Sequence, residues 1–187
     1  GSGTGAIAAW ENAARLAADG RFGENKMRIY ASQNAPFTIM YDSWKAHSRE
    51  LVPMTPEEGR QNAEVILGKV LSNRKPPYSL AGGLFDVLEK SGGDMFKVSN
   101  DEIVSWVVKY FSLEGYDLFP ASACAVSSLK QALDAGIVKH DETVMLNVTG
   151  GGMLGATRKG FILKEPDLIL SPDLPAEEII AAVDKLF

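Results

Sequence analysis

Hydrophobic residues along the chain recur at two different spacings, and each spacing predicts one kind of element. From residue 4 to residue 19, apolar side chains stand three or four positions apart, as at Ile7, Trp10 and Ala14, which predicts a helix that ends at Gly20. Short runs of apolar residues predict strands instead. Such runs occupy residues 26–32, 95–98, 142–148 and 168–170.

Helical patterns fill the stretches between these strands. One helix has a strong start signal, because Thr55 can cap its first amides, Pro56 suits its first turn and two glutamates follow. The expected helices cover residues 37–47, 56–71, 82–89, 100–111, 121–135 and 175–186. Strands that alternate with helices of this length indicate a three-layer α/β fold, with a mostly parallel sheet and helices on both of its faces.

Length and charge narrow the class of protein further. The chain has 187 residues, of which 45% are hydrophobic, so we expect residues 1–187 to form a single α/β domain. Its net charge of −5, without a block of Lys and Arg, argues against a nucleic-acid partner. No apolar run approaches the length of a membrane span and no signal peptide is visible, so we expect a cytoplasmic protein without a membrane partner.

Few residues are suited to redox or metal chemistry. The chain has one cysteine and two histidines, which excludes an internal disulfide and makes a metal site a poor interpretation. Cys124 stands in an apolar helix without a neighbouring base, so it is predicted to be a small buried hydrophobe rather than a nucleophile. His47 and His140 stand among polar residues and are predicted to lie on the surface.

A glycine-rich segment opens the chain and leads directly into the first predicted helix. Backbone amides at a helix start, with two hydroxyls beside them, can hold a phosphate group. Gly1, Gly3 and Ala6 also fit the dinucleotide fingerprint, but that interpretation needs an acidic residue at the end of the next strand, where Gln33 stands. A single phosphate monoester, such as that of pyridoxal phosphate, is the preferred ligand, and a tight loop that binds nothing is the alternative. The candidate phosphate-binding residues are Gly1, Ser2, Gly3, Thr4 and Gly5.

A second glycine cluster, residues 149–152, follows the apolar run 142–148. In a parallel sheet, ligands bind beyond the carboxyl ends of the strands, so the Thr149 hydroxyl could point into that crevice. The alternative is a plain turn whose glycines only supply positive φ angles.

A basic loop could hold an anionic substrate. It consists of Asn73, Arg74 and Lys75, followed by two prolines that restrict its conformation. A solvated surface loop is the alternative. Arg158 and Lys159, after the second glycine cluster, are a weaker candidate for the same role.

Seven segments, in order along nearly the whole chain, resemble the cysteate synthase family, which lies in the threonine-synthase branch of fold-type-II pyridoxal-phosphate enzymes. They are residues 1–7, 19–23, 33–37, 73–79, 113–115, 120–123 and 146–152. The Pro-Ala-Ser-Ala segment and the Thr-Gly-Gly-Gly segment resemble threonine synthases generally. The Gln-Asn-Ala-Pro-Phe and Arg-Lys-Pro-Pro-Tyr segments are more specific to the cysteate branch.

The resemblance implies part of the large domain of a fold-type-II enzyme. It implies that the first glycine loop holds the phosphate of pyridoxal 5′-phosphate and that Thr149 is the hydroxyl partner of the pyridine nitrogen. It also implies that sulfite replaces the phosphate of O-phospho-L-serine, giving L-cysteate for coenzyme M synthesis. A neutral hydroxyl does not force the ring nitrogen to stay protonated, and the weaker electron sink that results suits elimination of a good leaving group.

The resemblance also places part of the active site outside this chain. The family's Schiff-base lysine and cofactor-binding asparagine lie upstream of the phosphate loop, so no catalytic residue is expected here and the chain alone should be inactive. Its expected partners are the N-terminal half of the same enzyme and further copies in a homo-oligomer. A threonine synthase-type lyase and a non-catalytic nucleotide-binding module remain alternatives, and water remains an alternative to sulfite.

Overall fold

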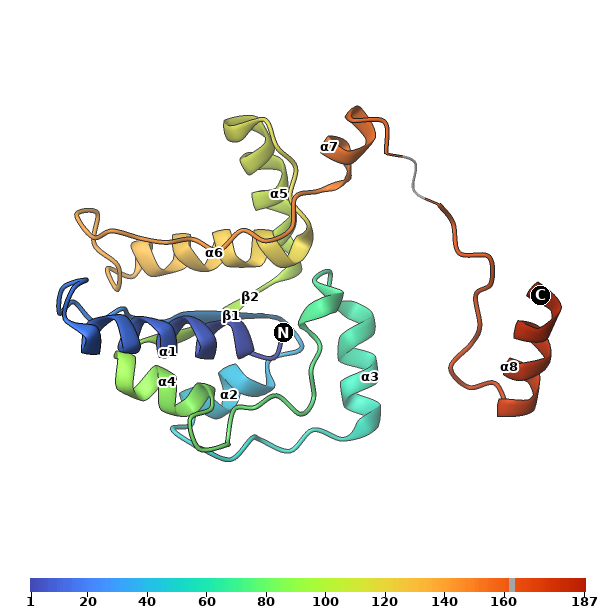
Figure 1. Cartoon of the computed structure of the whole chain (residues 1–187), viewed down its shortest axis with the longest axis horizontal. Helices are drawn as coiled ribbons and strands as arrows, with labels where there is room; N and C mark the ends of the chain where they lie inside the picture. The colour runs from blue at the N-terminus through green and yellow to red at the C-terminus, as the bar shows by residue number, and fades with distance from the viewer. Residues whose placement is uncertain (162–163) are drawn as a thin grey trace. The chain divides into compact units, whose positions relative to one another are not determined.

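The computed structural model describes residues 1–161 and 164–187 of the chain (Figure 1). Contacts within the chain divide it into two compact units, Gly1–Gly155 and Ala156–Phe187. The division falls inside α7 (Met153–Arg158). That residues 1–187 belong to one domain of a larger enzyme stays a prediction.

The centre of the first unit is a parallel pair of strands. β1 (Tyr30–Asn34) and β2 (Asp94–Val98) run in register, with Tyr30 opposite Asp94 and Asn34 opposite Val98. Because the strands are parallel, their carboxyl ends lie at the same edge of the sheet, at Asn34 and Val98.

Helices cover both faces of this sheet, as Figure 1 shows. Side chains on β2 alternate between the faces, so that Met95 packs with α2 (Ile39–Lys45) and Phe96 packs with Ala132 of α6 (Pro120–Asp134). This arrangement confirms the predicted α/β class, with helices on both faces of a parallel sheet.

The helix ends follow the signals that the sequence carries. α1 (Thr4–Asp19) lies between two glycines in the left-handed conformation, Gly3 and Gly20. Thr55 caps α3 (Pro56–Val65) through a reciprocal pair of hydrogen bonds with Glu58. The remaining helices of the first unit are η1 (Lys69–Leu71), α4 (Leu84–Ser91) and α5 (Asn100–Glu114).

The helix expected over residues 56–71 is shorter than predicted. Asn100 ends it, because its Nδ2 donates to the carbonyl of Val65 at 3.0 Å and its Oδ1 accepts from the amide of Leu67 at 3.1 Å. A side chain 33 residues from Leu67 thus satisfies the groups at this helix end, which local sequence patterns do not reveal.

Three strand predictions also need correction. The strand expected over residues 26–32 begins at Tyr30 and ends at Asn34. Residues 142–148 and 168–170 form no helix or strand and have no ladder partners among the described residues. An apolar run becomes a strand only where a neighbouring backbone supplies its hydrogen bonds. Near residues 142–148, the described part of the chain forms one isolated bridge, between Leu118 and Gly151.

The second unit is small. It contains α8 (Ala176–Val183), with Glu177 and Glu178 in its first turn, followed by η2 (Asp184–Leu186). These elements agree with the helix expected over residues 175–186. Across both units, the described residues include no helix with the length and hydrophobicity of a membrane span.

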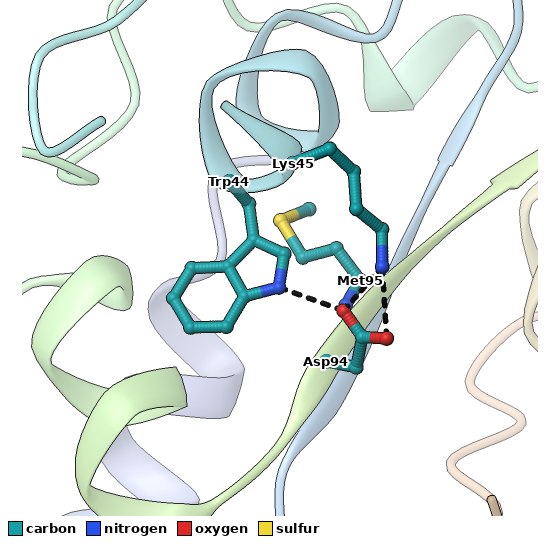
Figure 2. Close-up of polar contacts among 4 residues, drawn as sticks. All are labelled: Trp44, Lys45, Asp94 and Met95. Atoms are coloured by element: carbon teal, nitrogen blue, oxygen red, sulfur yellow. Dashed lines mark hydrogen bonds and ion pairs between the residues drawn. The ribbon is translucent and has the colours of Figure 1, made fainter. Parts of the chain in front are cut away.

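Asp94 ties α2 to the amino end of β2, opposite the carboxyl edge. Figure 2 shows the Trp44 indole and the Lys45 ammonium directed at its carboxylate. Trp44 Nε1 donates at 2.7 Å, Lys45 Nζ at 2.6 and 2.8 Å, and the Met95 amide at 2.7 Å. Burial raises the pKa of the Asp94 carboxyl, but these hydrogen bonds outweigh it and hold the pKa below its ordinary value.

Replacing Asp94 with alanine is expected to lower the free energy of unfolding by about 2 kcal/mol, because the Trp44 and Met95 donors lose a charged acceptor. The native pKa lies below the unfolded value, so the part of this contribution that depends on the ionised carboxylate is complete above the unfolded pKa of about 3.9 and is lost as the pH falls through the native pKa. Denaturant unfolding of both proteins from pH 3 to pH 7 measures it. Asp141→Ala, at an exposed aspartate, is the control; an equal loss in that variant would contradict the prediction.

Candidate functional site

The amino end of α1 has the backbone geometry of a phosphate cradle. The first hydrogen bond within the helix runs from the amide of Ile7 to the carbonyl of Gly3, at 3.0 Å. The amides of Gly5 and Ala6 therefore precede the helical ladder at the positive end of the helix dipole, while the Thr4 amide donates to Ser2 Oγ at 3.5 Å. No acidic side chain lies in this first turn to oppose an anion.

Two glycines let the neighbouring elements approach this loop closely. A Cβ on Gly3 would lie 2.9 Å from Leu84 Cδ2, and Gly3 also has a φ angle of +81°. A Cβ on Gly1 would lie 3.2 Å from the carbonyl oxygen of Val70. The Ser2 and Thr4 hydroxyls lie 2.9 Å apart beside the open amides. Open amides, two hydroxyls and side-chain-free backbone together fit the phosphate of pyridoxal phosphate.

The second glycine cluster is held against the start of α6. The Gly150 amide donates to Ser122 Oγ at 2.9 Å, and the Gly150 carbonyl accepts from the Phe119 amide at 3.1 Å. A Cβ on Gly152 would lie 1.9 Å from Asp117 Oδ2. The glycines at 150 and 152 thus permit close contacts, and neither has a positive φ. Thr149, which precedes them, is exposed.

The first turns of α6 carry Ser122, which contacts the second glycine cluster, and Cys124. Cys124 itself is fully buried, and burial raises the pKa of its thiol to about 11. The thiol therefore stays protonated near neutral pH, which confirms the prediction of a buried hydrophobe.

The basic loop contributes one of its three candidates to a pocket. The Asn73 side-chain oxygen accepts from the Lys75 amide at 2.9 Å and so shapes the turn. Arg74 instead lines a pocket of about 260 Å³ beside α3, whose lining does not include Asn73 or Lys75. The lining residues are Phe37, Pro56, Gly59, Arg60, Ala63, Ser72 and Arg74.

The carboxyl end of β1 carries two buried amide side chains whose roles the sequence analysis missed. Gln33 Oε1 accepts from the amides of Met40 and Tyr41, both at 2.9 Å, and thereby caps α2, while its Nε2 is buried without a partner among the described residues. Asn34 Oδ1 accepts from the Gly68 amide at 2.9 Å. The sequence signal that could have revealed these roles is the pair of adjacent amide side chains at the end of an apolar run.

Comparison with known proteins adds a family to this geometry. The pyridoxal-phosphate dependent enzyme family matches residues 1–150. Cysteate synthase from Methanosarcina acetivorans is 41% identical over 182 residues, which cover 96% of this chain and 44% of the relative. Cysteate synthase from Methanocella paludicola is 41% identical over 98% of this chain, and that from Methanoculleus marisnigri is 46% identical over 81%. The chain spans less than half the length of these curated relatives.

Proposed function

Because the chain belongs to the pyridoxal-phosphate dependent enzyme family, we propose that a full-length protein containing it replaces the phosphate of O-phospho-L-serine with sulfite, giving L-cysteate. The observation that carries this proposal is the 41% identity to cysteate synthase over 96% of the chain. The structure agrees with it in one further respect: β1 ends at Gln33 and Asn34, without the acidic residue that a dinucleotide-binding module needs.

This chain would supply one side of the cofactor site. The amides of Gly5 and Ala6 and the hydroxyls of Ser2 and Thr4 would bind the cofactor phosphate, and the Thr149 hydroxyl would bind the pyridine nitrogen. The chemistry that bound pyridoxal phosphate supplies is withdrawal of electrons from the α-carbon of the amino acid. A neutral hydroxyl at Thr149 leaves that withdrawal weaker than a carboxylate would, which suits loss of a good leaving group.

The net replacement exchanges one bond at the β-carbon. The C–O bond breaks and phosphate leaves with its electron pair, while the lone pair on the sulfur of sulfite forms the C–S bond. The proton that leaves the α-carbon returns to it, so no oxidant or reductant is needed.

We propose that the Schiff-base lysine lies in the part of the enzyme outside this chain. We also propose that the enzyme is a cytoplasmic homo-oligomer.

The test uses the full-length protein that carries this chain, loaded with pyridoxal phosphate. We expect visible-range cofactor absorbance and formation of cysteate and phosphate in equal amounts from O-phosphoserine and sulfite. Formation of threonine from O-phosphohomoserine in place of cysteate would favour the threonine synthase alternative. Phosphate release that does not require sulfite would favour water as the second substrate, and absence of cofactor absorbance would contradict both.

Replacing Thr149 with valine keeps the shape of the side chain and removes its hydroxyl. We expect the cofactor to stay bound, because the phosphate cradle is untouched, and kcat to fall by an amount equivalent to about 1–3 kcal/mol. Steady-state rates and the absorbance spectrum measure the two effects. Thr143→Val, at an exposed threonine on the same segment, is the control. Full activity in Thr149→Val would restore the plain-turn interpretation.

A further inference from the structure

Two arginines from different elements line the pocket beside α3. Arg60 comes from α3 and Arg74 from the basic loop, while Phe37, which is 1% exposed, is a buried apolar residue of the lining. The third polar residue, Ser72, already donates its hydroxyl to the Lys69 carbonyl at 2.7 Å. The side-chain hydrogen-bond donors that the described lining can offer a ligand are therefore the two guanidinium groups.

The backbone of α3 makes room for Arg74. A Cβ on Gly59 would lie 2.3 Å from Arg74 Cδ, so the arginine stem lies directly against a glycine in the helix interior. Glycine at such a position weakens a helix. The close approach of Arg74 supplies a physical reason for glycine at this position.

Arg60 is available to a ligand at low cost. Its partner is Glu57, one turn earlier in α3, at 3.4 Å, and the two side chains are 66% and 62% exposed. An exposed pair of this kind contributes little to stability, so a doubly charged oxyanion can compete with Glu57 for the guanidinium. No ion pair is recorded for Arg74 in the described part of the chain.

The pocket lies near the phosphate cradle. Phe37 follows the carboxyl end of β1 by three residues, and Ser72 follows Val70, whose carbonyl oxygen approaches Gly1. A ligand in the pocket would therefore lie at the same edge of the sheet as the proposed cofactor.

We propose that Arg60 and Arg74 form one oxyanion subsite, which holds the phosphate group of the amino-acid substrate and afterwards the sulfite that replaces it. This inference rests on the proposed function. The leaving phosphate and the incoming sulfite are each bonded in turn to the same β-carbon of the substrate. Both are small oxyanions that a guanidinium recognises through paired hydrogen bonds. One pair of arginines can thus bind the phosphate group before it leaves and the sulfite before it adds.

The test is steady-state kinetics of the full-length, cofactor-loaded enzyme with Arg60→Gln and Arg74→Gln. Each change is expected to raise the KM for O-phosphoserine and the KM for sulfite at least about tenfold, with cofactor absorbance unchanged. Gly59→Ala is expected to raise both constants too, because its methyl group displaces Arg74, without lowering the melting temperature. Arg15→Gln is the matched control, since Arg15 is an exposed helical arginine paired with Glu11 at 3.8 Å.

The outcomes separate this inference from the proposed function. If the parent enzyme makes cysteate and the Arg60 and Arg74 variants match Arg15→Gln, the subsite is wrong. If only the KM for O-phosphoserine rises, sulfite does not use these arginines and the shared subsite is wrong. If the parent enzyme makes no cysteate, calorimetric titration with inorganic phosphate decides. Weaker phosphate binding in both variants then supports the subsite, and unchanged binding overturns it.

Discussion

Replacing Gly3 with alanine is expected to weaken cofactor binding at least about tenfold, since the phosphate would lose charge-assisted hydrogen bonds to amides of the cradle. Gly3 has a φ angle of +81°, which costs an alanine about 1–2 kcal/mol, and the new methyl group would meet Leu84 at 2.9 Å. Relief of either strain rotates the backbone that aims the first amides of α1. Titration of the apo-enzyme with pyridoxal phosphate, followed by visible absorbance, measures the effect.

The other end of the same helix supplies the control for Gly3. Gly20 has a φ angle of +79° and open space around its missing Cβ, so Gly20→Ala imposes the same kind of backbone strain without touching the cradle. We expect cofactor affinity to be unchanged in that variant. Equal loss of cofactor in both variants would mean that general destabilisation, and not the cradle, governs binding.

Replacing Gly93 with alanine is expected to cost about 3 kcal/mol of folding free energy or more. The Cβ would lie 1.7 Å from the carbonyl oxygen of Ile29 and 2.8 Å from its carbonyl carbon, which are backbone atoms that cannot rotate away. The Asp94 amide donates to that same carbonyl at 3.2 Å, so any shift disturbs the start of the strand pairing. Urea unfolding of the parent protein and the variant measures the lost folding free energy. If the variant does not fold, a drop in its soluble yield reports the effect.

The neighbouring glycine separates steric from conformational cost. Gly92 ends α4 with a φ angle of +65°, and no atom lies within 4 Å of its missing Cβ. Gly92→Ala should therefore cost only about 1 kcal/mol, from backbone strain. A cost as large as that of Gly93→Ala would contradict the steric explanation.

The local signals determined most of the elements. The helix end at Gly20 and the cap at Thr55 depend on residues within one turn of each end, which is why the sequence alone predicts them. The alternation of helices with apolar runs was likewise sufficient for the α/β class. The glycine loop before α1 indicated a phosphate cradle, because its chemistry resides in consecutive backbone amides.

Contacts between distant segments lay beyond these signals. Asn100 ends α3 from 35 residues away along the chain, and the stretch 142–148 has apolar character but no neighbouring strand among the described residues. Arg60 and Arg74 line the same pocket, and Arg74 can lie there because Gly59 of α3 has no side chain to block it.

The sequence by itself thus determined the class of fold and the family resemblance and pointed to a candidate phosphate cradle, since each depends on residues that are neighbours in the chain. Only the tertiary structure decided which strands pair, that Gln33 caps α2, and that Arg74 shares a pocket with Arg60. The physical reason is that burial and long-range hydrogen bonding depend on what packs against a segment, and that partner is set by the folded chain as a whole.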